Sequence, residues 1–493
     1  MAPFAFAAAR LGRFSGHGTL LAAADSSARL GGLVLVITPC QPWVWDCLPL
    51  KGRTGRTVFS QLFLTEPVAV LLESPGSQPT PQARYSICAG RPRRDRQWVC
   101  GLGEVLPTLQ QFPQTPTVPS EVAHLPFTGG WLGWLGYELA WEIEALPPLK
   151  PDPLPFPVAF WYEPQSFAIL DHQTEELYLA ASSAADLALL QQRLEDMPNV
   201  SAIEIPGRSR AIELAAGWQP HTYQAAVRTL LHHIRMGDIF QANLSARFCH
   251  HGTVQPWQQY LRLQHINPSP FASYWQTPWG YIVSCSPERL VHLKGKTVQT
   301  RPIAGTRPRG QTAAGDRAQA TDLLNNTKEQ AEHIMLVDLE RNDLGRICRW
   351  GSVVVDELLT LEYYSHVIHL VSNVRGTLDT GVTPAAVIRA LFPGGTITGC
   401  PKVRCMEILA ALEPFPRNLF YGSCGYWDQR GHLDLNILIR TLLVAADRQT
   451  TWGQVGAGIV ADSEPEQEWQ ESLNKAQALL LALGSPTRVG THA

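Results

Sequence analysis

The chain has 493 residues, of which 45% are hydrophobic and 17% are charged, and its formal net charge is −3. This composition is ordinary for a globular protein, and the near balance of charge gives no overall attraction to nucleic acid or to an anionic membrane surface. No run of about 18 uncharged apolar residues occurs, so the sequence predicts no membrane span.

The N-terminal segment and the cysteines bear on the cellular compartment. Residues 1–23 are rich in alanine, contain Arg10 and Arg13 and lack acidic residues. This pattern fits either a transit peptide or an extended or misassigned start, and we favour the second. The ten cysteines are scattered and include no Cys-x-x-Cys pair, which argues against a zinc site or a disulfide framework. We therefore expect a cytoplasmic protein, because the cytosol keeps thiols reduced.

Short strands and proline-rich connections are predicted for the first half of the chain. The segment 129–137 mixes glycines with tryptophan and leucine, a pattern typical of a buried strand that another backbone approaches closely. A helix is predicted at 184–195, and connections are predicted at 106–125 and 147–157. The predicted strands are 33–38, 68–72, 85–88 and, within 158–179, two strands around a turn at 171–174.

Longer elements are predicted from residue 221 onward. The helix at 221–236 should end at Gly237, because glycine readily adopts the backbone conformation that terminates helices. The remaining predictions are helices at 318–339 and 468–483 and strands at 238–248 and 279–293.

The domain organisation follows from these segments. We expect a smaller N-terminal subdomain at 31–205 and a larger domain at 206–485, built around one shared α+β core. An extension at 1–30 and a tail at 486–493 would flank them.

Carboxylates at helical spacing occur on two of the predicted helices. Glu329 and Glu332 are three residues apart, and Glu468, Glu471 and Lys475 continue the same pattern, so each set shares a helix face. Two carboxylates from separate helices could chelate Mg²⁺, which takes oxygen ligands and keeps waters that a substrate can replace. From the spacing alone, a solvated face with a Glu471–Lys475 ion pair is the more common arrangement.

Two segments have a composition suited to anions. Residues 393–402 are glycine-rich and precede a predicted helix, with Pro401 expected at its first position, and free N–H groups at a helix start attract anions. The Gly-Lys-Ser/Thr ending of a nucleotide-binding loop is missing, so a carboxylate is the better candidate ligand. Residues 299–310 carry three arginines and could hold a polyanionic small molecule. For both segments an ordinary turn is a comparable alternative.

Two histidines lie in a stretch with strand character. His366 and His369 are three residues apart and would face opposite sides of a strand, so only one of them can face a site. A histidine between apolar neighbours is more often a core residue than a catalyst.

Taken in order, these stretches resemble the catalytic subunits of anthranilate synthase and aminodeoxychorismate synthase, members of the chorismate-utilising enzyme family. The resemblance is strong over about residues 220–480 and weaker at 71–74, 85–86 and 129–137. The fold that it implies is α+β, with antiparallel β-sheets stacked as a sandwich and flanked by helices. The matching stretches are 238–244, 286–289, 301–310, 328–338, 341–346, 366–370, 393–404, 439–441, 456–463 and 471–475.

The resemblance implies chorismate as substrate and Mg²⁺ as cofactor. Glu332 and Glu471 resemble the Mg²⁺ ligands, and the metal would hold the ring carboxylate of chorismate and help the C4 hydroxyl to leave. His369 resembles the general acid/base. Glu329 would lie beside the leaving hydroxyl.

Further matching positions concern the substrate pocket. Phe420 stands where anthranilate synthases usually have a tyrosine, so the hydrogen bond of that tyrosine is expected to be missing. The resemblance assigns substrate binding to Thr306, Thr396, Arg440, Lys475 and the backbone of Gly458.

The nucleophile is indicated by Gln241. Relatives that add water carry a lysine base at the matching position, whereas a neutral amide cannot deprotonate water and ammonia needs no such activation. The resemblance therefore implies an aminating enzyme. Because no glutaminase domain is apparent, ammonia should come from a separate glutamine amidotransferase subunit.

Two products remain open at this point. Ala304 is the residue typical of anthranilate synthases, since aminodeoxychorismate synthases usually have a lysine there that attacks the ring. The stretches 267–273, 394–401 and 422–426 look more like the folate branch. We favour 4-amino-4-deoxychorismate, for 4-aminobenzoate and folate synthesis, over anthranilate plus pyruvate, for tryptophan synthesis. A non-catalytic chorismate-binding subunit is a third interpretation, which the complete set of matching site residues disfavours.

A regulatory tryptophan site is suggested by Glu73 and Ser74. In feedback-inhibited anthranilate synthases a Pro-Tyr-Met stretch contributes to this site, whereas this chain has Phe271 and Ala272 after the proline. Tryptophan would thus meet Glu73, Ser74 and Phe271, but inhibition is not expected.

Overall fold

The computed structural model describes residues 41–74, 84–115, 117–196, 213–214, 219–310, 312–364 and 367–484. The chain divides into a unit of residues 1–37 and a unit of residues 38–493, and every described residue belongs to the second unit. The predicted extension and strand before residue 41, His366 and the predicted tail lie outside the described residues.

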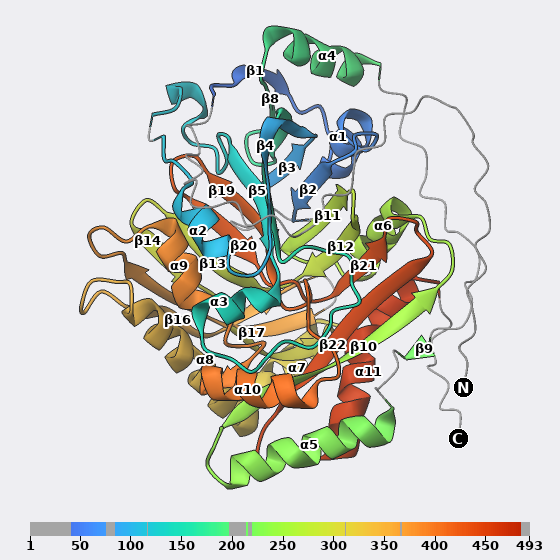
Figure 1. Ribbon diagram of the computed structural model, residues 1–493, viewed down its shortest axis with the longest axis vertical. Coiled ribbons are helices and arrows are strands. Elements are labelled where there is room, and N and C mark those ends of the chain that lie inside the picture. Colours follow the sequence, from blue (N-terminus) through green and yellow to red (C-terminus); the bar gives the residue numbers. More distant parts are fainter. Residues whose placement is uncertain are drawn as a thin grey trace, which may run out of the picture. The chain divides into compact units, whose positions relative to one another are not determined.

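One antiparallel sheet, here called sheet A, places strands from both halves of the chain side by side (Figure 1). In spatial order its strands are β1 (Val44–Pro49), β8 (Glu176–Ala181), β7 (Ser166–Asp171), β3 (Tyr85–Ala89), β2 (Ala69–Glu73), β11 (Phe271–Thr277), β12 (Gly280–Ser286), β21 (Thr441–Ala445), β22 (Thr450–Ile459), β10 (Gln241–His251) and β18 (Gly399–Cys400). A short strand, β9 (Glu213–Leu214), also pairs with β10. The two halves of the chain meet where β2 pairs with β11.

A second antiparallel sheet, sheet B, is also built from both halves. In spatial order its strands are β15 (Ile303–Pro308), β17 (Val367–Thr377), β14 (Thr297–Thr300), β13 (Arg289–Lys294), β20 (Leu433–Asn436), β19 (Ser423–Asp428), β5 (Gly130–Leu135), β6 (Ala159–Pro164) and β4 (Pro92–Cys100), and β16 (Val354–Tyr363) pairs with β17. Here the halves meet where β5 pairs with β19. The predicted boundary at 205 falls outside the described residues and stays a prediction, but the shared core is evident in both sheets.

The two sheets pack against each other. Trp134 of β5 meets Trp275 of β11 edge to face, with ring centroids 5.8 Å apart. Ser273 of β11 contacts Cys424 of β19 at 3.5 Å between Oγ and Sγ. Together with the antiparallel pairing, these contacts confirm the expected α+β fold of stacked sheets.

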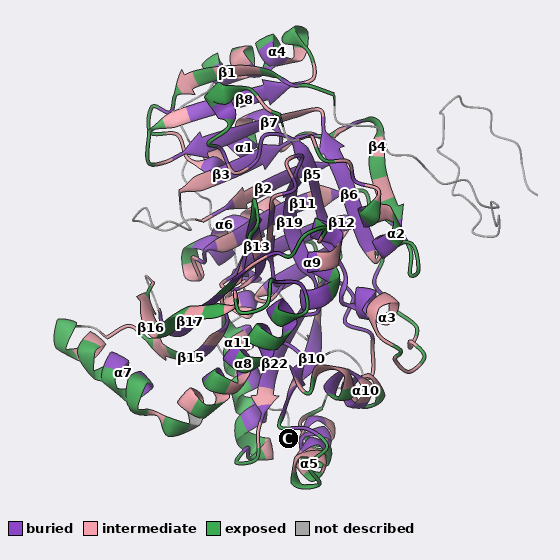
Figure 2. Cartoon of the chain, turned by 90° about the vertical axis from the view of Figure 1, so that its left-hand side faces the viewer, coloured by how far each residue is buried: buried purple, intermediate pink, exposed green. Residues whose placement is uncertain are grey.

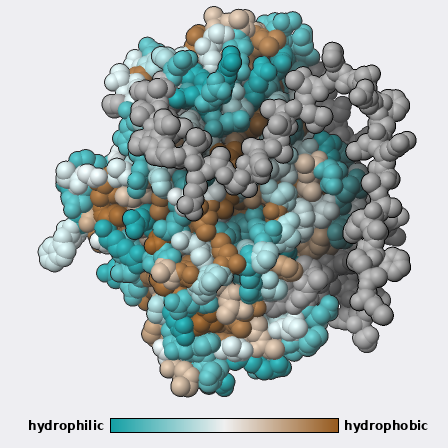
Figure 3. Space-filling view, viewed as in Figure 1, coloured by the Kyte–Doolittle hydropathy of each residue, from teal (hydrophilic) through white to brown (hydrophobic). Residues whose placement is uncertain are grey.

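Helices cover the outer faces and ends of the sheets. They are α1 (Gly55–Leu62), α2 (Val105–Gln110), α3 (Ala140–Ile143), α4 (Ala184–Glu195), α5 (Pro220–Arg235), α6 (Pro256–Ile266), α7 (Ala313–Asn325), α8 (Thr327–Gly345), α9 (Pro384–Leu391), α10 (Lys402–Leu412) and α11 (Pro465–Ala482). Figure 2 shows largely buried strands in the centre and mostly exposed residues on outer helices such as α4 and α7. Within the described part of the chain, none of these helices has both the length and the apolar character that crossing a membrane requires. On the face shown in Figure 3, hydrophobic residues reach the surface in separate patches among hydrophilic ones.

A hydrophobic cluster fixes the elements around the later site. It joins Tyr223 of α5, Leu244 of β10, Leu409 of α10, Ala457 of β22 and Trp469 of α11. Figure 1 shows α5 and α11 at the lower end of the view, next to β10 and β22. Burial of such side chains supplies about 1.5–3 kcal/mol each, so α11 is held firmly against β22.

The predicted helix at 318–339 is two helices in the structure, α7 and α8. Asn326 separates them and caps α8, because its side-chain oxygen accepts a hydrogen bond from the N–H of Glu329 at 3.0 Å. Asparagine is among the preferred capping residues, so the break has a local cause. The break sets the direction in which the first turn of α8 presents its acidic side chains.

Three other predicted segments are divided or wrongly assigned. The predicted strand at 279–293 is interrupted at Pro287, which cannot donate to a β-ladder, and becomes β12 and β13. The segment 158–179 contains three strands instead of two, because a break at Gln165 separates β6 from β7. The predicted connection at 106–125 begins within a helix, α2, whose apolar side chains are buried.

The glycine-rich strand prediction at 129–137 is confirmed by β5, all of whose residues are buried. Gly133 lies between two neighbouring strands, and a Cβ at this position would come within 2.3 Å of the Trp161 ring and 2.4 Å of the Phe160 carbonyl oxygen. The glycine is therefore required by the close approach of the neighbouring strand.

We expect the Gly133→Ala substitution to destabilise the fold by about 1–3 kcal/mol or more, because the contact to backbone cannot be relieved by a side-chain rotation. The midpoint of urea unfolding measures this loss. Gly101→Ala is the matched control, because Gly101 is exposed and its added Cβ would find only an ordinary contact at 3.5 Å. Equal midpoints for the two variants would contradict the packing argument.

Candidate active site

The first turns of α8 carry two predicted acidic residues, of which Glu329 faces sheet B. The helix packs against β15 and β17. Glu329 pairs with Arg307 of β15, with 2.8 Å between Oε1 and Nη1. Gly305, at φ +90°, makes room for this carboxylate, since a Cβ there would lie 2.8 Å from Oε2 of Glu329. Glu329 is thus held against the strand by an arginine.

Strands β15 and β17 bring together two residues predicted for the site. Thr306 lies opposite His369 in the ladder, and its Oγ1 is 2.8 Å from Nδ1 of the histidine. Burial and the nearby Arg440 lower the pKa of His369 to about 4. The imidazole is therefore neutral near pH 7 and is able to accept a proton. Ala304 is buried and contributes no functional group.

The start of β10 contributes Gln241. Its Nε2 donates to Oε1 of Glu332 at 2.7 Å. The amide oxygen of Gln241 is buried and has no hydrogen-bond partner among the described residues. Gly458 of β22 permits this contact, since a Cβ there would lie 2.7 Å from Nε2 of Gln241 and 3.2 Å from Oε1 of Glu332. An unpaired buried acceptor costs roughly 1–3 kcal/mol, so this oxygen marks a place where a ligand can donate.

Groups that can donate hydrogen bonds lie around the glycines near the end of β22. Lys475 of α11 donates to the carbonyl oxygen of Gly456 at 3.1 Å and pairs with Oε1 of Glu471 at 2.6 Å. The hydroxyl of Tyr421 faces the same glycine, since a Cβ there would lie 2.8 Å from it. Arg440 lies nearby, and burial lowers its pKa while Tyr421 and Glu471 act in the opposite direction. Cationic and hydroxyl donors of this kind suit a carboxylate ligand.

Glu288 is a site residue to which the sequence analysis gave no role. It follows Pro287 in the short connection between β12 and β13, and its carboxyl lies beside Thr396 and near Arg440. Burial raises the pKa of Glu288 to about 8, although Thr396 and Arg440 favour its charged form. The signal in the sequence was a single acidic residue, within the resembling stretch 286–289, between two apolar strands.

Phe420, at the position where anthranilate synthases usually have a tyrosine, offers no hydroxyl, and the loss of that hydrogen bond stays a prediction. Phe420 lies in the interior against Arg247, whose guanidinium carbon is 5.6 Å from its ring centroid. Its neighbour Tyr421 is the residue whose hydroxyl faces Gly456, as described above. Tyr421 is therefore an additional candidate donor, to which the sequence analysis gave no role.

The arginine-rich stretch 299–310 forms strands and not a loop, namely the end of β14 and β15. Its arginines are engaged by carboxylates of neighbouring elements, so each of them already has an anionic partner. The pairs are Arg301 with Glu357 and Glu362, Arg307 with Asp322 and Glu329, and Arg309 with Asp316. Thr306 is the residue of this stretch that contacts another candidate site residue, His369.

The donor set for a divalent cation would consist of Glu332 and Glu471. Both lie next to β22, Glu332 beside Gly458 and Glu471 through its pair with Lys475. Within the described ranges, no group of three or more His, Cys, Asp or Glu side chains could hold an ion on its own. Mg²⁺ is commonly bound by one or two carboxylates together with waters and substrate, so these residues fit that ion.

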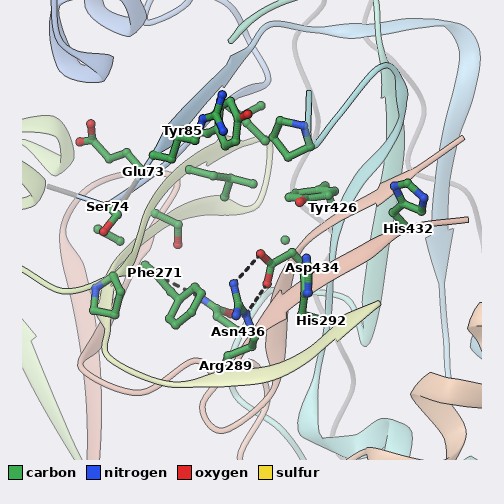
Figure 4. A pocket seen from close by; sticks show the side chains of 18 of the residues that line it. Glu73, Ser74, Tyr85, Phe271, Arg289, His292, Tyr426, His432, Asp434 and Asn436 are labelled. Atoms are coloured by element: carbon green, nitrogen blue, oxygen red, sulfur yellow. Dashed lines mark hydrogen bonds and ion pairs between the residues drawn. The ribbon is translucent and has the colours of Figure 1, made fainter. Parts of the chain in front are cut away.

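A separate cavity of about 720 Å³ is lined by strands of both sheets (Figure 4). The three residues predicted for a tryptophan site, Glu73, Ser74 and Phe271, all line it. None of the candidate catalytic or metal-binding residues described above does so. The structure thus places the two predicted sites apart.

The carboxyl of Glu73 is turned away from this cavity. Its Oε1 accepts hydrogen bonds from the hydroxyl of Tyr260, at 2.8 Å, and from Nε2 of Gln264. Burial raises the pKa of Glu73 to about 7. On the opposite wall Arg289 lies over the ring of Phe271 and is paired with a carboxylate, as the dashed lines in Figure 4 show. A ligand in the cavity would therefore meet no free carboxylate at Glu73.

Comparison with known proteins gives concordant results. The family described as chorismate binding enzyme matches residues 73–481. An anthranilate synthase component I-like protein of Synechocystis sp. is 57% identical over 90% of this chain and 92% of its own length. Aminodeoxychorismate synthase component 1 of Bacillus subtilis is 44% identical over 72% of this chain and 77% of its own length. The crystal structure of anthranilate synthase component I from Streptococcus pneumoniae superposes with a TM-score of 0.71, at 33% identity, over 81% of this chain and 92% of that one.

Proposed function

The chain belongs to the family of chorismate binding enzymes and is a chorismate-utilising enzyme, and from this premise we propose that it adds ammonia to chorismate to form 4-amino-4-deoxychorismate. The observation that carries amination is the amide of Gln241 at the site. Its nitrogen is anchored on Glu332 and its buried oxygen lacks a donor within the described part of the chain. An amide cannot deprotonate water, but its oxygen can accept a hydrogen bond from ammonia and orient it.

The two carboxylates of chorismate would be held by the donor groups around β22. Arg440 and Lys475 supply positive charge, and the hydroxyl of Tyr421 supplies a further donor. The missing side chains at Gly456 and Gly458 let polar groups approach the strand closely, the hydroxyl of Tyr421 at Gly456 and the contact of Gln241 with Glu332 at Gly458. Charge-assisted hydrogen bonds are about twice as strong as neutral ones, so such a cluster would select a dicarboxylate.

Proton transfer would be divided between Glu288 and His369. Glu288 holds its proton at neutral pH and would donate it to the departing C4 hydroxyl. His369 is neutral and would accept a proton, with Thr306 orienting its ring. Glu329, paired with Arg307, would accept a hydrogen bond from the same hydroxyl.

Mg²⁺ is proposed as the cofactor, held by Glu332 and Glu471. When bound, it would neutralise the ring carboxylate and act as a Lewis acid on the leaving group. Glu471 is half exposed and paired with Lys475, which leaves its carboxylate accessible to an incoming ion. Both carboxylates belong to helices packed on the sheets, so the fold would keep them in place.

The observations that bear on the product point to two different reactions. The aminodeoxychorismate synthase relative and the folate-like stretches at 267–273, 394–401 and 422–426 support amination at C4. Ala304 favours a second candidate, anthranilate formation, because its methyl group cannot attack the ring and ammonia would have to react directly. One relative is named after anthranilate synthase and another is an aminodeoxychorismate synthase, so the names support the second candidate as well as the first.

The ammonia for this reaction would come from a partner protein. Relatives are named as component I or component 1, which supports a separate glutamine amidotransferase partner that delivers ammonia.

Glu73, Ser74 and Phe271 remain the candidates for contacts to tryptophan. We do not expect inhibition by tryptophan, because the carboxyl of Glu73 is already engaged by Tyr260 and Gln264.

Product analysis tests the proposed reaction. The purified chain is incubated with chorismate, MgCl₂ and ammonium at mildly alkaline pH, with and without added aminodeoxychorismate lyase. We expect 4-aminobenzoate only in the presence of the lyase, and no change in rate when tryptophan is added. His369→Ala, in which the base is removed, is the control for contaminating activity.

Each other outcome selects a different function. Anthranilate without the lyase would replace the proposal by the second candidate and make Ala304 the informative residue. Bound chorismate without any product would indicate a non-catalytic subunit.

A further inference from the structure

Arg417 has a buried guanidinium group that is shared by three segments of the candidate active site. The side chain is 2% exposed. Its Nη1 donates to the carbonyl oxygen of Ile397 at 2.8 Å, and its Nη2 donates to the carbonyl oxygen of Asn243 at 2.7 Å. The guanidinium also lies over the ring of Tyr421, 4.8 Å from the centroid. No other group described above joins these three segments.

Each of these contacts is next to a residue proposed to act on the substrate. Ile397 follows Thr396, which lies beside the carboxyl of Glu288. Asn243 lies on β10 two residues after Gln241. Tyr421 is itself proposed as a donor to the substrate. One side chain therefore links the segment of Gln241, the segment of Thr396 and the ring of Tyr421.

Two residues proposed to bind the substrate have backbone conformations that require support. Tyr421 and Arg440 have φ angles of +64° and +51°, a region that residues with a side chain rarely adopt. Conformations of this kind are strained and persist only where the surroundings hold them. The face of the Tyr421 ring is held by Arg417.

The guanidinium is fixed in turn by Glu413. Nε and Nη2 of Arg417 donate to the two carboxylate oxygens of Glu413, both at 2.8 Å. Glu413 also accepts hydrogen bonds from the N–H and hydroxyl of Ser245 on β10, at 2.9 and 2.7 Å. The ring of Tyr137 lies 4.6 Å from the guanidinium carbon. The orientation of Arg417 is therefore fixed by the bidentate pair and by rings.

We propose that Arg417 is a positioning residue that sets the affinity for chorismate and its alignment with the reacting groups, an inference that rests on the proposed site. It touches no reacting atom and acts through the backbone of Ile397 and Asn243 and through the ring of Tyr421. Lysine cannot replace it, because an ammonium group lacks the planar set of donors that binds a carboxylate and two carbonyls at once.

Arg247 provides a matched control. It is also buried, lies on β10 and stacks on aromatic rings, here Phe415 and Phe420. Its hydrogen bonds go to Gln454 and to the carbonyl oxygen of Pro416, and none reaches a residue proposed to act on the substrate. Arg247→Lys thus reproduces the loss of a buried guanidinium that makes no hydrogen bond to Ile397 or Asn243.

The test compares Arg417→Lys with Arg247→Lys in the full chain. Calorimetry gives Kd for chorismate and needs no turnover, and chorismate consumption gives KM and kcat whatever the product is. We expect Arg417→Lys to raise Kd and KM at least about tenfold and to lower kcat roughly 10- to 100-fold, since small misplacements of reacting groups have effects of this size. Arg247→Lys should leave Kd and KM within about twofold of the parent.

These constants separate positioning from general destabilisation. Partial unfolding lowers apparent kcat but changes neither KM nor Kd, which report only on folded molecules. Unchanged Kd and KM in Arg417→Lys, or an equal rise in Arg247→Lys, would overturn the proposal. Binding without turnover in the parent chain would refute the proposed reaction and still leave the Kd comparison decisive for Arg417.

A second variant covers the case in which Arg417→Lys does not fold. Glu413→Gln keeps the volume of the side chain and weakens the bidentate pair that orients Arg417. We expect a smaller rise of Kd and KM in the same direction. A folded Glu413→Gln protein with unchanged Kd, KM and kcat would overturn the proposal as well.

Discussion

Turnover of chorismate in the presence of Mg²⁺ should be lost in Glu471→Gln and in Glu332→Gln, while the fold stays intact. Each substitution removes one of the two carboxylates proposed to hold the cation, and a neutral amide is a poor ligand for Mg²⁺. Product formation measured over a series of MgCl₂ concentrations checks this expectation. A strongly raised Mg²⁺ requirement with partial recovery at high concentration would also support the assignment.

The control for this experiment lies on the same helix. Glu466 is an exposed residue in the first turn of α11 that hydrogen-bonds Gln224. Glu466→Gln removes one negative charge from α11 without approaching β22, so its Mg²⁺ dependence should match that of the parent chain. If Glu471→Gln kept full activity with an unchanged Mg²⁺ dependence, Glu471 would not be a metal ligand.

Glu288→Gln should lower kcat by about 10²–10⁴-fold, the range expected for removal of a general acid. Its pKa of about 8 means that the proton is present below pH 8 and is lost as the pH rises through that value. The rate of the parent chain should therefore fall on the alkaline side, and the residual rate of Glu288→Gln should not. The profile is recorded at saturating free ammonia at every pH, so that ionisation of ammonium does not contribute.

Two comparisons make this experiment specific. His369→Ala should lose a similar factor in rate but keep the alkaline fall, because Glu288 is still present. Glu73→Gln replaces another buried carboxyl with a raised pKa, about 7, that lines the separate cavity, and it should leave the profile unchanged. An alkaline fall that survives in Glu288→Gln would refute its role as the acid.

The same carboxyl links stability to pH. The pKa of Glu288 is raised from 4.5 to about 8, so the folded chain keeps a proton that the unfolded chain has lost between these values. The free energy of unfolding should therefore decrease as the pH rises through this interval. In Glu288→Gln this contribution is absent, so its stability should fall less steeply than that of the parent.

The fold was predictable from the sequence where a pattern is local. The glycine-rich strand β5, the helix α4 and the final helix α11 were predicted close to their observed bounds. The errors occurred where one residue interrupts a regular pattern, at Asn326 between two helices and at Pro287 between two strands. The pairing of β2 with β11 is set by packing between distant segments and leaves no local signal.

The candidate site shows the same division. Ordered motifs made Glu332, His369 and Lys475 candidates: helical spacing and resemblance both point to Glu332 and Lys475, and resemblance alone points to His369. Glu288 was missed, because the property that makes it useful is its burial beside Thr396, and burial depends on the assembled sheets. Arg417 was missed for a similar reason, since its partners lie on segments that are far apart in the sequence.

The interleaving of the two sheets has a consequence for how the enzyme is made. Strand β5 at residues 130–135 can pair only after β19 at 423–428 has been synthesised, and β2 must likewise wait for β11. Pairing over such sequence distances has a high contact order, which slows folding and exposes strand edges in the growing chain. The nascent chain should therefore depend on chaperones until most of its length has left the ribosome, and a chain cut between its halves should not yield a folded fragment.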